Sequence, residues 1–321
     1  MRFRILCMWQ GFLHCKEKLT INLHSDLQSK EASAMNDRLK RVAAIHDLSG
    51  FGRCSLSVIM PTLSAMGIQV CPVPTAILSS HTGGLGEVEF RDLTDFILPC
   101  LEHYKRLELE FECIYSGFLG SEEQIDHCLA FIHTYPNALA VVDPVMGDHG
   151  KAYRTYTGAM CERMRELVRE ADVITPNLTE ACLLLNLPYI DRALSMEDAR
   201  QLLTQLGDLG PQYTVITGVP MDTGTISNLG YDKKSNTFWI VNCDYLPVSY
   251  PGTGDIFASV LTGAFLSGDS LPIAMGKATC FAEECIKTTF SYSTDTRHGV
   301  MLEKVLAMPD HRFGTKPYSI L

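Results

Sequence analysis

The 321-residue sequence has no apolar run close to the roughly 20 residues that a membrane-spanning helix needs. It also has no excess of basic residues. Its formal net charge at pH 7 is −10, whereas proteins that bind nucleic-acid backbones usually present a basic surface. We therefore expect neither a membrane span nor nucleic acid as the main partner, and a compact ligand held by local features fits the composition better.

The twelve cysteines contain no CxxC pair. Cys280 and Cys285 are the closest two in the main part of the chain, and they suggest neither a zinc site nor a disulfide framework. Reduced thiols are the simpler interpretation, and they predict a cytoplasmic protein.

Three common catalytic motifs are also missing. The sequence has no Walker A motif, and residues 147–151 do not have its spacing, so a P-loop kinase is not expected. It has no GxSxG turn and no HExxH pair, which argues against two common hydrolase classes.

The first 34 residues differ from the rest. Residues 1–13 combine a basic start with a short apolar stretch, but no convincing small-residue cleavage site follows. We interpret 1–34 as a disordered leader or a misassigned start, because Met35 directly precedes the first strand pattern. A weak signal peptide is the alternative. Residues 35–321 are expected to form one domain.

From Arg41 onward, apolar β-rich runs alternate with segments of helical period. This alternation predicts a single α/β domain with a mostly parallel central sheet flanked by helices. Residues 147–158 are the best candidate for a mobile loop. Strands are expected at 42–46, 69–78, 113–116, 138–143, 173–175, 214–217, 226–231 and 237–241. Helices are expected at 56–66, 92–107, 122–134, 162–170, 179–185, 196–206, 255–266 and 273–290.

The sharpest motif is Pro251-Gly252-Thr253-Gly254-Asp255, which directly precedes an apolar helix pattern. Glycines at a helix start let backbone N–H groups converge on an anion, and the helix dipole adds favourable potential. Asp255 could accept the proton of a substrate hydroxyl as that oxygen attacks a γ-phosphate. The alternative is an aspartate that only caps the helix.

A second strong motif follows the strand expected at 138–143. That strand delivers two carboxylates, Asp143 and Asp148, to its carboxyl end, where open α/β sheets place their ligands. Such a pair can organise the hydrated Mg²⁺ that bridges ATP phosphates. One carboxylate after a strand is often only a cap, but two, with Pro144 fixing the turn, favour a ligand site.

Residues 46–53 follow the first expected strand and precede a helix. Asp47 and Ser49 could hydrogen-bond a substrate ring or hydroxyl there. The segment is no dinucleotide fingerprint, because Ser55 stands in place of the third glycine. The alternative is a glycine-rich turn in which Asp47 or Ser49 caps the helix.

Together these segments resemble the ribokinase-like vitamin kinases. The resemblance covers about Val42 to Pro309, and the closest branch resembles the pyridoxal kinases, with hydroxymethylpyrimidine kinases as neighbours. The segments that carry it, in the family's order, are 46–53, 79–84, 140–148, 174–180 and 251–255.

The resemblance implies a role for each matched residue. Asp255 would be the catalytic base, with Gly252, Thr253 and Gly254 as the anion hole. His81 and Thr82, in the Ser-Ser-His-Thr-Gly-Gly loop, would contact the vitamer together with Asp47 and Ser49. In the nucleotide part, the implied residues for ATP are Asp143, Asp148, Asn177, Thr217 and Gly218.

The Thr-Pro-Asn-Leu-Thr-Glu segment resembles the family's TPNxxE motif. Asp143, Asp148 and Glu180 would then hold the metal with its water shell, and Thr175 would help to bind a monovalent cation such as K⁺. The alternative is that Asn177 or Thr179 only caps the following helix.

The implied activity is ATP-dependent phosphorylation of the hydroxymethyl group of pyridoxal, pyridoxine or pyridoxamine in vitamin B6 salvage, by a homodimer that uses Mg²⁺. Two alternatives stay open. Hydroxymethylpyrimidine kinase of thiamin synthesis acts on a similar alcohol, and the 47–52 segment looks somewhat like that branch, whereas the Ser-His-Thr-Gly loop favours pyridoxal. A non-catalytic vitamin-binding module of the same fold is the other alternative.

Overall fold

The computed structural model describes residues 38–153, 156–244, 246–308 and 313–321. The chain divides into two units, Met1–Leu39 and Lys40–Leu321. The segment 1–34, for which we expected a leader, lies outside the described residues. The second unit carries the fold and the site.

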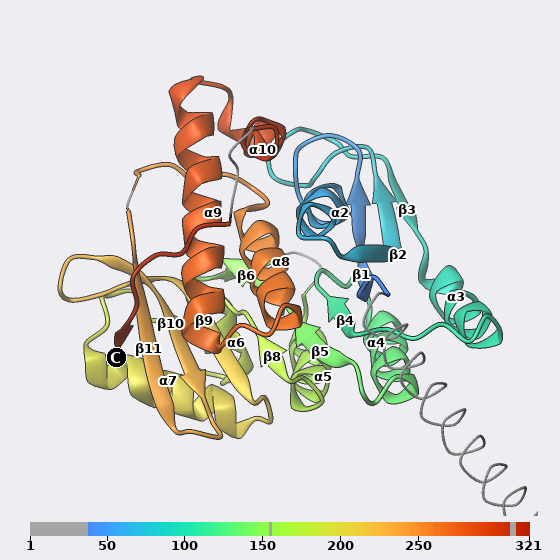
Figure 1. Ribbon diagram of the computed structural model, residues 1–321, viewed down its shortest axis with the longest axis horizontal. Coiled ribbons are helices and arrows are strands. Elements are labelled where there is room, and N and C mark those ends of the chain that lie inside the picture. The colour runs from blue at the N-terminus through green and yellow to red at the C-terminus, as the bar shows by residue number, and fades with distance from the viewer. Residues whose placement is uncertain (1–37, 154–155, 245, 309–312) are drawn as a thin grey trace, which may run out of the picture. The chain divides into compact units, whose positions relative to one another are not determined.

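The elements of the second unit alternate between strands and helices for much of its length (Figure 1). In chain order they are β1 (Arg41–Ser49), α2 (Leu56–Ala65), β2 (Gln69–Leu78), β3 (Phe90–Asp92), α3 (Thr94–Arg106), β4 (Cys113–Ser116), α4 (Glu122–Thr134), β5 (Leu139–Val142), β6 (Gly147–Asp148), β7 (Lys151–Ala152), α5 (Gly158–Arg169), β8 (Val173–Ile174), α6 (Leu178–Leu184), α7 (Met196–Asp208), β9 (Tyr213–Pro220), β10 (Ile226–Asp232), β11 (Thr237–Cys243), α8 (Thr253–Leu266), α9 (Leu271–Ser291), the 3₁₀ turn η1 (Thr296–His298), α10 (Leu302–Leu306) and β12 (Ser319–Ile320).

One large sheet runs through this unit, in the order β12-β11-β10-β9-β8-β5-β4-β1-β2-β3. The central strands from β9 to β2 are parallel to their neighbours. Antiparallel strands flank them at both edges. The prediction of a mostly parallel sheet flanked by helices is confirmed.

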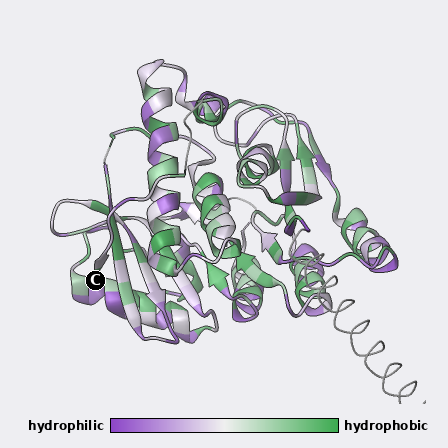
Figure 2. Cartoon of the chain, viewed as in Figure 1, coloured by the Kyte–Doolittle hydropathy of each residue, from purple (hydrophilic) through white to green (hydrophobic). Residues whose placement is uncertain are grey.

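Helices cover both faces of the sheet, so the unit has three layers. In β1, Ala43 and Ile45 pack with α3 to α7, whereas Val42 and Ala44 pack with α2 and α8 to α10. A strand buried on both faces reads as a continuous apolar run, which is why β1 could be recognised in the sequence. Figure 2 shows hydrophobic residues along the central strands and mixed colours along the helices.

The differences from the expected elements lie at short or edge segments. Phe90–Asp92 pairs with β2 as an edge strand, so the helix expected to begin at 92 begins at Thr94. Helix α5 begins at Gly158 rather than at 162, because the Thr157 side chain caps it. Part of the expected mobile loop 147–158 forms the two-stranded β6–β7 sheet.

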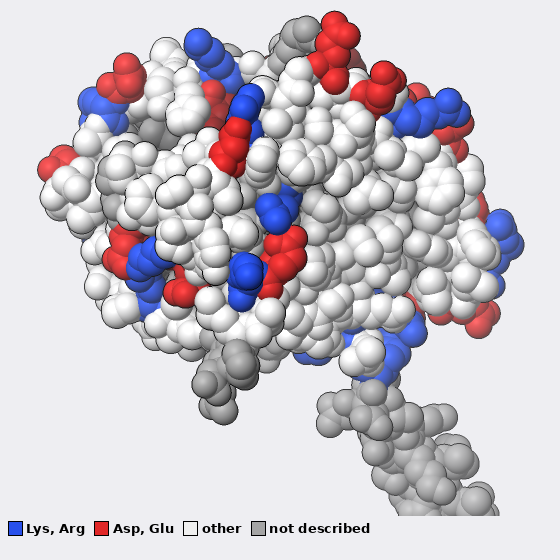
Figure 3. Space-filling model, turned by 90° about the horizontal axis from the view of Figure 1, so that it is seen from above, with Lys and Arg blue, Asp and Glu red and all other residues white. Residues whose placement is uncertain are grey.

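No helix in the described part of the chain combines the length and apolar character that crossing a bilayer requires. Among the described residues, Lys and Arg side chains stand beside Asp and Glu side chains in several places on the face seen from above (Figure 3). On this face the two signs of charge are therefore mixed. The cysteines in the described ranges carry free thiols.

Candidate active site

The start of α8 has the geometry of an anion-binding site. Gly252 occupies its N-cap position with φ 81°, in the left-handed region that favours glycine. A Cβ at this position would lie 2.0 Å from the carbonyl oxygen of Arg53, so no side chain fits. Because glycine offers no capping side chain, the first amides of α8 remain available to a ligand.

Asp255, in the first turn of α8, is held by the chain that precedes α2. The backbone N–H of Ser55 donates to Asp255 Oδ2 at 2.8 Å. Ser55 in turn donates from its hydroxyl to Asp47 Oδ1 at 2.5 Å, and Ser49 donates to Asp47 Oδ2 at 3.0 Å. The Asp47 carboxylate is therefore linked to Asp255 through a single residue, and that residue has the unfavourable φ of 48°.

The surroundings of Asp255 tune its proton affinity. Burial raises the pKa of this carboxyl to about 7, with a smaller contribution from the negative charge of Asp47, while the Ser55 amide acts in the opposite direction. A carboxyl with a pKa near neutral pH is well suited to accept a proton in catalysis.

Two further carboxylates interact with each other, Asp143 directly after β5 and Glu180 in the first turn of α6. Asp143 is only 7% exposed, and burial followed by the charge of Asp255 raises its pKa. Burial and the charge of Asp143 raise the pKa of Glu180 well above its ordinary value. Buried carboxylates that repel one another in this way are a favourable environment for a cation.

The TPNxxE segment also has a clear structural role. Asn177 Oδ1 accepts from the Glu180 N–H at 2.9 Å, and Glu180 Oε2 accepts from the Asn177 N–H at 2.8 Å. The two residues form a capping box at the start of α6. Asn177 Nδ2 donates to the Gly147 carbonyl, and Thr179 Oγ1 accepts from the Gly150 N–H, both at 2.9 Å. This segment therefore fixes the turn that carries Asp148.

A cleft of about 1030 Å³ runs along this edge of the sheet. All the residues that the sequence assigned to catalysis, ATP and metal line it. They are Asp143, Asp148, Thr175, Asn177, Glu180, Thr217, Gly218, Gly252, Thr253, Gly254 and Asp255.

The residues assigned to the vitamer are placed differently, because none of them is among the residues that line this cleft. Asp47 and Ser49 are buried, and their polar atoms bond to each other and to Ser55. Thr82 is exposed.

Both ring nitrogens of His81 are occupied by the backbone. Its Nδ1 accepts from the Gly83 N–H at 2.9 Å, and its Nε2 lies 2.6 Å from the Arg297 carbonyl oxygen. The Nε2-protonated tautomer satisfies both contacts. His81 thus ties its loop to η1, and Gly83 and Arg297 line the cleft at this junction.

Sequence reasoning missed the residues of the cleft on the β10–β11 side. Asn228, Asp244, Thr279 and Glu283 line it there. One feature of the sequence could have pointed to this side of the cleft: Glu283 is a charged residue within the apolar pattern of α9. Ser55 was noticed only as a missing glycine, although its amide contacts Asp255.

Comparison with known proteins places the chain in a family. The phosphomethylpyrimidine kinase family model matches residues 60–301. A Bacteroides thetaiotaomicron protein described as a phosphomethylpyrimidine kinase, in a crystal form with pyridoxal, is 45% identical with a TM-score of 0.82, covering 88% of this chain and 100% of that chain. Pyridoxal kinase from Lactobacillus plantarum is 32% identical with a TM-score of 0.78, covering 84% of this chain and 96% of that chain.

Sequence comparison gives the same assignment. Pyridoxal kinase PdxY of Leifsonia xyli is 24% identical over 286 residues, which are 85% of this chain and 98% of that protein. The chain therefore belongs to the phosphomethylpyrimidine kinase family, in the pyridoxal kinase branch of the ribokinase-like vitamin kinases.

Proposed function

We propose that this protein is a pyridoxal kinase, which transfers the γ-phosphoryl group of ATP to the hydroxymethyl oxygen of pyridoxal, pyridoxine or pyridoxamine. The observation that carries the proposal is the position of Asp255. It lies in the first turn of α8, beside the open amides of an anion site, in a cleft large enough for a nucleotide. The 45% identical relative in a crystal form with pyridoxal supports the vitamer.

In the proposed mechanism, Asp255 accepts the proton of the hydroxymethyl group as its oxygen attacks the γ-phosphate in line. The amides of Thr253 and Gly254, with the N-terminal dipole of α8, stabilise the charge that develops on the transferred group. The side chains of Asn177 and Thr217 hold the remaining phosphates, and Gly218, whose N–H donates to Asn228, leaves room for them because it has no side chain. Positioning within the cleft supplies most of the remaining rate enhancement.

Mg²⁺ fits the acidic end of the cleft. Asp143, Asp148 and Glu180 would hold it, and when bound it would offset negative charge on the phosphates. Among the described residues, no group of three or more His, Cys, Asp or Glu is placed so that it could hold a metal ion by itself. These carboxylates would therefore act together with the phosphates and with water, which Mg²⁺ commonly keeps as ligands. The buried Thr175 hydroxyl, which lies beside the Asp143 carboxyl, would help to bind K⁺.

We place the vitamer between Asp255 and the loop 79–84. Thr82 is exposed there and free to hydrogen-bond the ring, while His81 holds the loop in place. Asp47 and Ser49 do not touch the vitamer in this arrangement. Asp47, which accepts hydrogen bonds from Ser49 and Ser55, instead holds Ser55 in place beside the vitamer site.

The test is release of ADP by the full chain with ATP and Mg²⁺, comparing pyridoxal, pyridoxine, pyridoxamine and hydroxymethylpyrimidine. We expect a B6 vitamer to be preferred, and Asp255→Asn to lower kcat by about a hundredfold or more. Preference for the pyrimidine would support the alternative of a hydroxymethylpyrimidine kinase. Tight vitamer binding without turnover would support a non-catalytic module.

A homodimer and a cytoplasmic location belong to the same proposal. The edge of the sheet at β2 and β3 exposes the large apolar side chains of Ile77 and Phe90, which a second copy could cover. The free thiols are consistent with a reducing compartment. Sedimentation equilibrium of the full chain tests the dimer, and a monomer at micromolar concentration would contradict it.

A further inference from the structure

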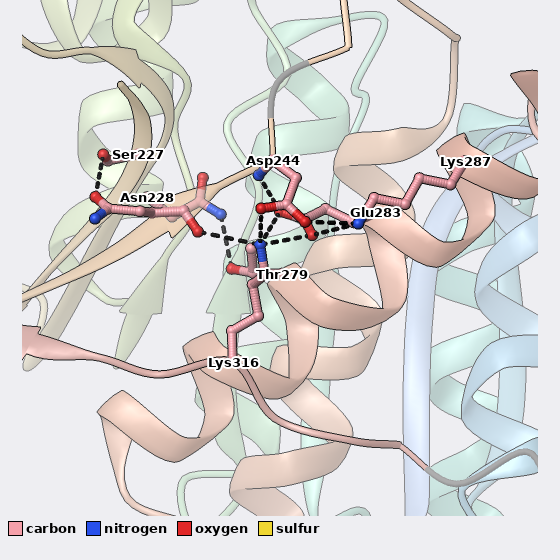
Figure 4. A network of polar contacts seen from close by, with 8 residues as sticks. Ser227, Asn228, Asp244, Thr279, Glu283, Lys287 and Lys316 are labelled. Atoms are coloured by element: carbon pink, nitrogen blue, oxygen red, sulfur yellow. Dashed lines mark hydrogen bonds and ion pairs between the residues drawn. The ribbon is translucent and has the colours of Figure 1, made fainter. Parts of the chain in front are cut away.

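A network of polar contacts joins Asp244 and Glu283 to Lys287 and Lys316 beside β10, β11 and α9 (Figure 4). Two carboxylates line the cleft there, Asp244 after β11 and Glu283 on α9. The Glu283 side chain is 9% exposed, and its Oε1 accepts from the Asp244 N–H at 2.7 Å. The proposed phosphoryl-transfer mechanism does not use either group.

Two lysines, which are not among the residues that line the cleft, form ion pairs with these carboxylates. Lys316 Nζ lies 2.8 Å from Glu283 Oε2 and 2.9 Å from Asp244 Oδ1. Lys287 Nζ lies 2.6 Å from Asp244 Oδ2 and 3.7 Å from Glu283 Oε2. The Lys316 side chain is 18% exposed and that of Lys287 is 44% exposed. Because solvent screens an exposed charge more strongly, Lys316 contributes more to holding the two carboxylates together.

Lys316 reaches this network from the far end of the chain. It precedes β12, which pairs with β11, and its Nζ also donates to the Asn242 carbonyl at 3.4 Å. The C-terminal segment thereby contributes a charge to a site built mainly from β10, β11 and α9.

The same side of the cleft contains the turn assigned to ATP. Asn228 Oδ1 accepts from the Gly218 N–H at 2.9 Å, and Asn228 Nδ2 donates to Thr279 Oγ1 at 2.8 Å. With the phosphates directed from Gly218 toward Asp255, the nucleoside would extend toward Asp244 and Glu283. Carboxylates only accept hydrogen bonds, and ribose hydroxyls and exocyclic amino groups donate them.

We propose that Lys316 is a positioning residue for the nucleoside part of the phosphoryl donor. It holds Glu283 and Asp244 in the geometry in which they accept hydrogen bonds from the nucleoside. The identity of the donor rests on the proposed function.

The test is calorimetric titration of the full chain with Mg²⁺ and a non-hydrolysable ATP analogue. Lys316→Met is expected to raise the Kd of the analogue about tenfold, and Lys316→Arg to restore most of the affinity. In the assay, KM for ATP should rise while kcat and KM for the vitamer stay within about twofold. If Lys316 only stabilised the fold, its loss would not raise KM for ATP while leaving kcat and KM for the vitamer unchanged.

Arg200→Met is the matched control. Arg200 anchors the same C-terminal segment, because its Nε donates to the Leu321 carbonyl at 3.0 Å, but it does not line the cleft. Its loss should leave the Kd of the analogue unchanged.

Two results would overturn the inference: a wild-type Kd in folded Lys316→Met, or an equal loss of affinity in Arg200→Met. If Lys316→Met does not fold, Lys316→Gln, which keeps hydrogen-bond donors but removes the charge, is judged by the same Kd criterion. A wild-type chain that binds the analogue but phosphorylates no vitamer would contradict the proposed function and leave this inference standing. A wild-type chain that binds no analogue would contradict both.

Discussion

His46 is a buried residue with a direct effect on stability. It lies in β1 with its ring centroid 4.4 Å from that of Tyr115, and a Cβ on Gly117 would come within 2.2 Å of its ring. Neither ring nitrogen has a hydrogen-bond partner within the described ranges. Burial lowers the pKa of this histidine from 6.5 to about 3, so it stays neutral in the folded protein.

The lowered pKa of His46 predicts a loss of stability in mild acid. Below pH 6.5 the unfolded chain binds a proton at this position and the folded chain does not, so stability falls as the pH drops from 6.5 toward 3. Between pH 7 and 5 the free energy of unfolding should lose about 2 kcal/mol from this residue. Urea unfolding of wild type and His46→Gln measures it, and equal pH dependence in both proteins would contradict the prediction.

Asp255 should set the pH dependence of the reaction. Its pKa is raised to about 7, and only the deprotonated carboxylate can accept the hydroxyl proton. We therefore expect kcat/KM to increase with pH up to about 7 and then to level off. A kcat/KM that is constant between pH 5.5 and 8 would remove Asp255 from the role of base.

At the scale of elements, the first turn of α8 allows a paired test of the anion site. Gly252→Ala forces a Cβ against the Arg53 carbonyl oxygen in a left-handed conformation, so both stability and activity should fall. At Gly254 a Cβ would meet open space, so Gly254→Ala should fold normally and lose activity because its methyl group intrudes on the phosphate.

Thermal unfolding and initial rates of the two variants provide the measurement. We expect a lower Tm for Gly252→Ala, by several degrees for ~2 kcal/mol, and an unchanged Tm for Gly254→Ala. Full activity in Gly254→Ala would show that these amides do not bind the transferred phosphate.

Elements with a clear apolar pattern or cap could be predicted from the sequence, and short strands at the edges of the sheet could not. The bounds of β2, β4 and α4 agree with the expected 69–78, 113–116 and 122–134, because each has a full period of apolar residues or a clear cap. Strands β3 and β12 have three and two residues. Such short segments form strands because the edge of the neighbouring strand is free to pair with them. The residues of the segment itself carry no pattern that indicates this pairing.

At the scale of the whole molecule, the sequence predicted only those residues of the candidate site that belong to a local motif. Asp143 and Asp255 were identified because each follows a recognisable motif at a strand end or a helix start. Ser55 and Glu283 depend on partners that lie far away in the sequence, since Ser55 contacts Asp255 and Glu283 contacts Lys316. Only the folded chain reveals such pairs.

The distribution of carboxylates predicts how nucleotide binding depends on the metal. Asp143, Asp148, Glu180 and Asp255 all line the cleft where we propose that the phosphates bind, in a chain of net charge −10. A triphosphate entering without a cation meets like charges in partly buried surroundings, where screening is weak. Removing Mg²⁺ with EDTA should therefore raise the Kd of a non-hydrolysable ATP analogue by about a hundredfold or more, which is ~2.7 kcal/mol.

Adenosine distinguishes this electrostatic effect from a general loss of the site. It carries no phosphate, so its weaker binding on the β10–β11 side should be the same with and without Mg²⁺. Calorimetric titration of both ligands in both conditions gives the comparison. If the analogue binds equally well in EDTA, the carboxylates do not require a cation and the proposed magnesium site is wrong. If adenosine loses affinity in parallel with the analogue, the metal acts on the fold of the cleft rather than on the charge of the phosphates.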